Sequence, residues 1–228
     1  MTQTRMTPPS LPPFKGHHLQ LELVDPGSVR LIRAYEHPMG DWHPAPVEFR
    51  RNHVDPPPGY GDAFAMLYTA SNIQAAATEV RAMWRDPRLG RSFWCPKAAA
   101  AHRVARFELE SPGLFIPIDG PNRMVFGLQG RYDPSYETSR WVALALFRRY
   151  GHLAHGLSYE SFHRFQPGRV YAIWHSRKEG LLLRSKDGHP AVIDDPEWRA
   201  FLGAHPEVER QPGARGEGWV EALDGVSI

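Results

Sequence analysis

The alternation of apolar and polar residues divides the first half of the chain into strands and one helix. Ser28–Tyr35 and Phe64–Ala70 are rich in bulky and β-branched residues, which is typical of strands. From Ser71 onward the apolar residues recur every three or four positions, which predicts a helix. Ser71 is its expected N-cap, with Gln74 completing a capping box. The expected buried stripe consists of Ile73, Ala76, Ala77, Val80, Met83 and Trp84.

One carboxylate interrupts the apolar character of this predicted helix. Glu79 lies beside Val80 and three residues after Ala76, so it borders the buried stripe. A glutamate in such a position is most often solvated or paired with a cation. A functional role for Glu79 therefore needs support from other parts of the chain.

The second half of the chain predicts further strands and two helices. Asp133–Gly151 is the clearest helix, since Asp133 is a suitable N-cap, Pro134 fits the first turn and Gly151 fits the end. A later helix, again opened by Asp-Pro, is expected within residues 194–206. Strands are expected in "HRVARFELES", "LFIPI", "GLSYES", "RVYAIW" and "GLLLRS".

A long proline-rich segment separates the first two strands. Residues 36–62 contain only "VEFRR" (Val47–Arg51) as a possible short strand. Loops of this length inside a domain are usually functional or disordered.

The mixed order of about seven short strands and three helices predicts an α+β domain. We expect residues 1–20 to form a Pro-rich N-terminal arm, residues 21–205 the folded domain, and residues 206–228 a C-terminal extension. Neither the dinucleotide motif GxGxxG nor the P-loop motif is present.

Charge and cysteine content narrow the functional classes. Lys and Arg total 27 and Asp and Glu total 25, so the net charge is only +2, with no long basic run. We therefore expect no direct nucleic-acid binding. The single cysteine, Cys95, excludes an internal disulfide and fits a reducing cytoplasm. No signal peptide and no membrane segment are expected. The spacing of His152 and His155 is weak support for a metal site, and no metal is expected.

Five short segments follow one another along the chain: "LIRAY" with Arg33, "FRRN" with Arg50 and Arg51, "MLYTAS" with Tyr68, "AATEV" with Glu79, and "GLSYES" with Tyr159 and Ser161. In this order they resemble the RES domain family, which is named for an Arg, a Glu and a Ser. The resemblance extends over roughly Ser28–Leu183. The family often has "GRFN" followed by Pro-Gly where this chain has "FRRNHVDPPPG", so either Arg50 or Arg51 is the counterpart. Arg164 would be the arginine that follows the serine, displaced by two residues.

The resemblance implies an ADP-ribosyltransferase-like fold and NAD+ as substrate, without a metal. Many family members are toxins that cleave the nicotinamide–ribose bond and are neutralised by an Xre-type antitoxin in a hetero-oligomer, here expected to be dimer-based. The ADP-ribosyl acceptor differs among members: water, phosphate or a protein side chain. The implied catalytic residues are Glu79, Arg33 and Ser161. The implied NAD-binding residues are Arg33, Arg50, Arg51, Tyr68, Tyr159 and Arg164.

The chemistry agrees with these residue types. Cleavage of an N-glycosidic bond passes through an oxocarbenium-like state, which a nearby carboxylate such as Glu79 stabilises. Guanidinium groups suit a diphosphate, and the ring of Tyr68 suits stacking on nicotinamide. The alternative is a catalytically inactive RES-fold protein that binds a nucleotide or a partner.

Overall fold

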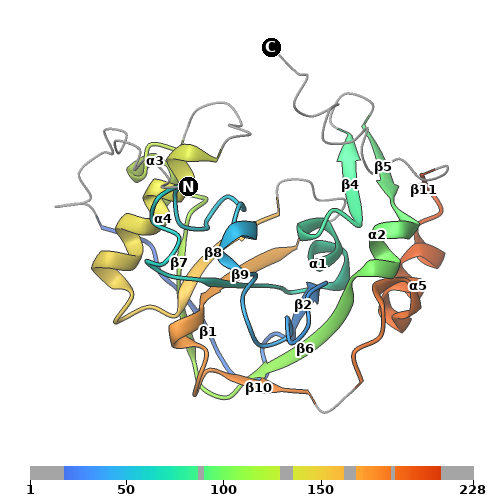
Figure 1. The fold of residues 1–228 in the computed structure, drawn as a ribbon, viewed down its shortest axis with the longest axis horizontal. Coiled ribbons are helices and arrows are strands. Elements are labelled where there is room, and N and C mark those ends of the chain that lie inside the picture. Colours follow the sequence, from blue (N-terminus) through green and yellow to red (C-terminus); the bar gives the residue numbers. More distant parts are fainter. Residues whose placement is uncertain (1–17, 87–89, 129–135, 162–167, 186–187, 212–228) are drawn as a thin grey trace.

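A curled eight-stranded sheet forms the centre of the molecule (Figure 1). In this computed structural model its strand order is β1-β7-β8-β9-β3-β2-β6-β10, and all pairs are antiparallel except β7 with β8. The strands are β1 (Glu22–Val24), β2 (Leu31–Tyr35), β3 (Met66–Ala70), β6 (Arg103–Leu109), β7 (Gly113–Pro117), β8 (Gly156–Glu160), β9 (Arg169–Trp174) and β10 (Leu182–Arg184). The structure describes residues 18–86, 90–128, 136–161, 168–185 and 188–211.

Helices and a smaller sheet complete an α+β fold, as the sequence predicts. The small sheet has the order β11-β5-β4, and β11 lies within the predicted C-terminal extension. Its strands are β4 (Met83–Asp86), β5 (Arg91–Trp94) and β11 (Val208–Arg210). The helices of the described residues are α1 (Ile73–Glu79), α2 (Pro96–Ala101), α3 (Asn122–Val125), α4 (Glu137–Tyr150) and α5 (Pro196–Ala204). No helix in these ranges is long and apolar enough to span a membrane.

The end of α1 differs from the prediction. The helix stops at Glu79, because Arg81 adopts a left-handed φ of 56° and the chain turns back. The amides of Arg81 and Ala82 donate to the carbonyls of Thr78 and Ala77, which is the Schellman arrangement at a helix end. The expected extension of the stripe to Met83 and Trp84 is therefore wrong, since both residues lie on β4.

The start of α1 also differs from the prediction. Asn72 is the N-cap, and its side chain accepts from the amide of Ala75. The hydroxyl of Ser71 instead accepts from the amide of Arg169 on β9. The cap therefore lies one residue later than predicted, and Ser71 joins the helix to the sheet.

The start of α5 and the end of α4 agree with the prediction, but α4 begins at Glu137 with Tyr136 as its N-cap, so the predicted helix start at Asp133 is wrong. Asp195 is the N-cap of α5 and Pro196 begins that helix, while Gly151 follows α4. The expected cap Asp133 and first-turn residue Pro134 lie outside the described residues, as does Arg164.

Within the proline-rich segment the expected short strand is absent. Val47–Phe49 form a 3-10 turn, η1, in which the amide of Phe49 donates to the carbonyl of Pro46. The fixed φ of Pro46 favours this local turn over pairing with a strand. The possible strand over Val47–Arg51 is therefore wrong.

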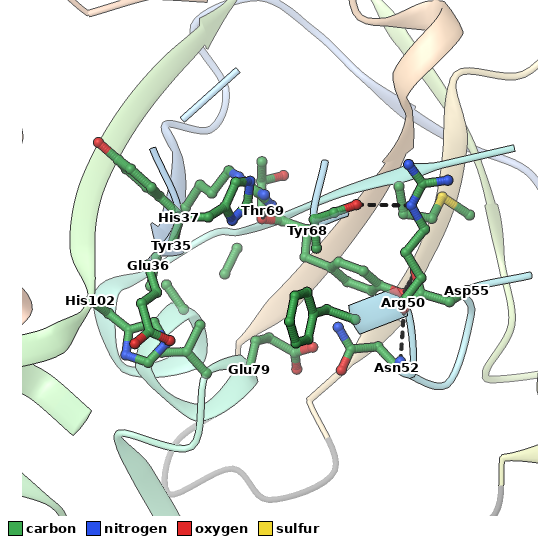
Figure 2. Close-up of a pocket in the computed structure, with 18 of the residues that line it drawn as sticks. Tyr35, Glu36, His37, Arg50, Asn52, Asp55, Tyr68, Thr69, Glu79 and His102 are labelled. Carbon is green, nitrogen blue, oxygen red and sulfur yellow. Dashed lines mark hydrogen bonds and ion pairs between the residues drawn. The ribbon is translucent and has the colours of Figure 1, made fainter. Parts of the chain in front are cut away.

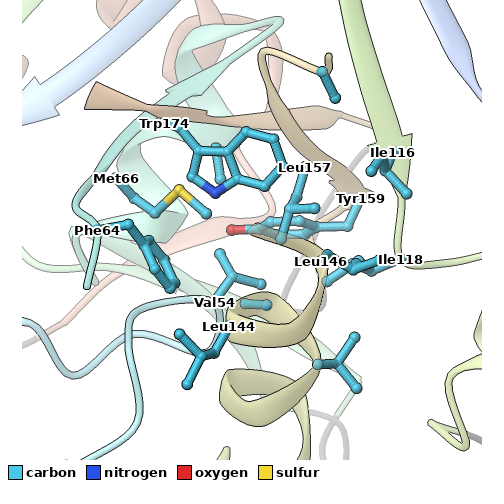
Figure 3. Packing of buried hydrophobic residues seen from close by; sticks show 14 of the residues in the cluster. Val54, Phe64, Met66, Ile116, Ile118, Leu144, Leu146, Leu157, Tyr159 and Trp174 are labelled. Carbon is cyan, nitrogen blue, oxygen red and sulfur yellow. The ribbon is translucent and has the colours of Figure 1, made fainter. Parts of the chain in front are cut away.

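Two buried clusters meet beside β3. One packs α4 against β3, β8 and β9, with Trp174 and Tyr159 among its largest side chains (Figure 3). The other packs α1, α2 and α5 against β2 and β6 and contains Ala70 and Ala76. A third cluster lies on the opposite face of the large sheet. A cavity lies at the boundary between the first two clusters.

Candidate active site

A cavity of about 560 Å³ lies between β2, β3, α1 and the proline-rich segment (Figure 2). Its volume is in the range of small-molecule and cofactor sites. Residues far apart in the sequence form its walls, and many of them are polar. The polar and charged lining residues are Arg33, Tyr35, Glu36, His37, Arg50, Asn52, Asp55, Tyr68, Thr69, Glu79 and His102.

Glu79 lies at the end of α1 and faces this cavity. Its Oε2 accepts from the Tyr159 hydroxyl at 2.9 Å, and its Oε1 lies 3.5 Å from the Ser161 Oγ. These partners arrive because β9 pairs with both β3 and β8. Burial raises the pKa of the Glu79 carboxyl to about 7, although both hydrogen bonds act in the opposite direction. The structure thus brings together three of the predicted site residues.

The two tyrosines have different positions relative to the cavity. Tyr68 lines it, whereas Tyr159 is buried in the cluster under α4 and meets the site through its hydroxyl. Tyr159 is therefore placed to orient Glu79, and Tyr68 is placed to contact a ligand.

Asp55 is a buried carboxylate of the cavity wall that could not be singled out from the sequence. Its Oδ1 accepts from the Tyr68 hydroxyl at 2.9 Å, and its Oδ2 accepts from the Asn52 amide at 2.8 Å. Burial raises the pKa of Asp55 to about 6, against the lowering effect of these hydrogen bonds. The Asn-x-x-Asp spacing before three prolines indicates a turn but not a cavity position.

Arg33 is buried and donates to main-chain carbonyls of the cavity wall. Its Nε lies 2.7 Å from the Gly40 carbonyl, its Nη1 3.0 Å from that of Tyr68, and its Nη2 3.4 Å from that of His43. Burial lowers the pKa of Arg33 to about 10, so the side chain remains a cation at neutral pH. Arg33 both lines the cavity and holds the proline-rich segment against β3.

The structure separates Arg50 from Arg51. Arg50 lines the cavity, and its guanidinium donates to the carbonyls of Ala45 and Gly61 at 2.9 Å each. Arg51 is exposed, is not among the lining residues, and donates to the Glu48 carbonyl at 3.2 Å. Of the two arginines that the sequence left open, Arg50 therefore faces the cavity.

A further arginine, also missed from the sequence, holds the same segment from the other side. Arg140 of α4 donates to the carbonyls of Pro56 and Arg50. Arg33, Arg50 and Arg140 thus fix a wall without strands by donating to neutral carbonyl groups. Their positive charge is retained near the cavity, since carbonyl acceptors do not neutralise it.

Comparison with known proteins identifies this fold but not a family. No family model and no curated protein match the chain. A chain of the M. tuberculosis MbcT–MbcA toxin–antitoxin complex is similar in structure, with a TM-score of 0.51 and 18% sequence identity. The similarity covers 75% of this chain and 89% of the matched chain. At this identity the match establishes a shared fold.

Proposed function

We propose that this protein binds NAD+ in the cavity and cleaves its nicotinamide–ribose bond. The observation that carries the proposal is Glu79, a half-buried carboxylate at the cavity, hydrogen-bonded to Tyr159 and near Ser161. The order of segments shared with the RES family and the fold shared with a toxin–antitoxin chain support the same function.

In this proposal Glu79 faces the ribose that is attached to nicotinamide. As that bond breaks, positive charge develops on the ribose, and the carboxylate stabilises it. Nicotinamide leaves as a neutral group and needs no general acid. The positively charged nicotinamide ring of bound NAD+ also favours the ionised form of Glu79, which counteracts the raised pKa. Tyr159 and Ser161 hold the carboxylate in this orientation.

The rest of the cavity is assigned to binding. Tyr68, held by Asp55, stacks on the nicotinamide ring. Arg50 and Arg33 supply positive charge for the diphosphate. The acceptor of the ADP-ribosyl group is water, phosphate or a protein side chain, and the product distinguishes them: ADP-ribose, phosphorylated ADP-ribose or a modified protein.

We further propose that the protein is a toxin whose activity is blocked by an antitoxin. Free NAD+ cleavage in the cytoplasm would damage the producing cell, so a control is required. The structural match is to a chain of a toxin–antitoxin complex, which supports such a partner. By resemblance the partner is of the Xre type and occupies the cavity mouth. A carboxylate of that partner would pair with the arginines there.

One observation favours a different function, in which the fold binds a nucleotide without cleaving it. All three guanidinium nitrogens of Arg33 donate to the main chain, and Arg50 is similarly engaged. Fewer donors then remain for a diphosphate than the family resemblance implies. Glu160, where the family often has proline, is consistent with this alternative.

The test is incubation of the purified protein with NAD+, followed by chromatographic detection of free nicotinamide. Release by the parent protein and loss of release in Glu79→Gln would support the proposal. NAD+ binding without release would favour the alternative function. If NAD+ is neither bound nor cleaved, both are wrong.

A further inference from the structure

Phe49 is an aromatic side chain that is both part of the cavity wall and largely open to solvent. It lines the cavity, yet 66% of its surface is exposed. It is one of the large apolar side chains that the folded chain leaves in water. Among the large apolar side chains that are exposed in the described residues, Phe49 is the aromatic one, and it lines the cavity.

The main chain around Phe49 is fixed although the ring is exposed. Phe49 ends η1, where its amide donates to the Pro46 carbonyl at 2.9 Å. The next residue, Arg50, donates to the carbonyls of Ala45 and Gly61 and so anchors the turn on both sides. Because this turn is already fixed, its main chain needs little ordering when a flat molecule stacks on the ring.

The position of Phe49 relative to Glu79 indicates which part of a ligand it would meet. The proposed reacting end of NAD+ lies at the half-buried Glu79 and beside Tyr68, which is held in place by Asp55. The opposite end of the dinucleotide must then extend toward solvent. Phe49 lines the cavity with 66% of its surface exposed, so its ring lies on the solvent side of the cavity.

We propose that Phe49 forms the adenine subsite, by stacking its ring on the adenine base of NAD+. This inference rests on the proposed function, since it takes the substrate and its orientation from there. Base–aromatic stacking contributes about 1–3 kcal/mol per base, so loss of the ring should weaken binding about tenfold.

The experiment measures binding by calorimetry in the Glu79→Gln background, where the ligand is not consumed. The ligands are NAD+, ADP-ribose and nicotinamide mononucleotide. Phe49→Ala should weaken binding of NAD+ and ADP-ribose about tenfold and leave nicotinamide mononucleotide unchanged. Phe49→Trp should retain the affinity of the parent. Val47→Ala is the matched control, because Val47 is on the same turn and 45% exposed but is not a lining residue.

The outcomes separate this inference from the proposed function. If the parent cleaves NAD+ but Phe49→Ala binds all three ligands normally, the adenine subsite is wrong and the function stands. If Phe49→Ala weakens nicotinamide mononucleotide as well, or instead, the assigned orientation is wrong. If Val47→Ala weakens binding equally, the effect comes from the turn and not from the ring, and the subsite is again wrong. A parent protein that neither binds nor cleaves NAD+ overturns both proposals.

Discussion

Replacing Glu79 with glutamine should stabilise the protein, and the gain should grow with pH. Burial raises the pKa of this carboxyl from 4.5 to about 7 in the folded chain. Because the folded-state pKa is above the unfolded-state value, protonation favours folding. This stabilisation is complete below about pH 4.5 and is lost as the pH rises through about 7. Glutamine has no charge to lose, so the variant keeps its stability across the range.

The size of the effect follows from the pKa shift. One pKa unit corresponds to about 1.4 kcal/mol, so a shift from 4.5 to about 7 gives an upper limit of about 3 kcal/mol at about pH 8. Glu79 is half-buried and open to the cavity, so we expect about 2 kcal/mol. In the parent protein the Tyr159 hydroxyl donates to the Glu79 carboxylate at 2.9 Å, and the side-chain oxygen of glutamine can accept the same hydrogen bond. Near pH 4.5 the gain should fall below about 0.5 kcal/mol.

Urea unfolding of parent and variant at about pH 5 and about pH 8 measures this gain. Glu108→Gln is the control for removing one carboxylate, since Glu108 is exposed on β6, and it should not reproduce the gain of Glu79→Gln. The same Glu79→Gln protein should release nicotinamide at least about a hundredfold more slowly than the parent. A gain that does not depend on pH, or a variant less stable than the parent at about pH 8, would refute the reasoning.

Four other predictions concern the groups around Glu79. Tyr159→Phe should move the acidic limb of the rate–pH profile to higher pH, because the hydrogen bond from Tyr159 lowers the pKa of Glu79 and its removal raises that pKa. An unmoved limb would contradict the orienting role of Tyr159. Arg33→Lys should weaken NAD+ binding in calorimetry and cost about 1–3 kcal/mol in urea unfolding, because an ammonium cannot reach all three carbonyls; unchanged affinity would exclude Arg33 from the phosphate site. Arg50→Lys should reduce NAD+ affinity several-fold while Arg51→Lys should not, and the reverse result would exchange their roles. A protein encoded beside this chain should co-purify with it and suppress nicotinamide release, whereas the chain alone should not shift DNA in a gel; a neighbour that neither binds nor inhibits would end the toxin proposal.

Local signals predicted those elements whose ends are marked by capping residues. The helix α5 begins at Asp195-Pro196 as expected, and β8 and β9 pair as the two adjacent strand patterns indicate. The boundary after α1 was not predictable in the same way. Arg81 occupies the left-handed position that glycine usually fills, and Met83 continues the helical spacing although it lies on a strand. The pairing of β4 with β5 determines that Met83 lies on a strand, and the spacing of apolar residues does not indicate this pairing.

The candidate site was predictable only in part, and mainly through the family resemblance. Glu79, Tyr159 and Ser161 do come together, although nothing in the local sequence links residues so far apart. The arginine contacts with main-chain carbonyls were not predictable. Such a contact requires no particular residue type at the acceptor position, because every residue has a main-chain carbonyl, so the sequence carries no signal for it. For this reason Arg140 was overlooked.

The pairing of β3 with β9 has a consequence for the protein during its synthesis. Glu79 follows β3, but its partners Tyr159 and Ser161 are positioned by β9, which ends at Trp174. At a bacterial-type rate of about 10 residues per second, roughly 10 seconds separate the appearance of Glu79 from that of Trp174. A nascent or truncated chain without β9 contains the carboxylate but not the groups that orient it. The site is thus assembled late, after most of the chain has left the ribosome, and an incomplete product should be inactive.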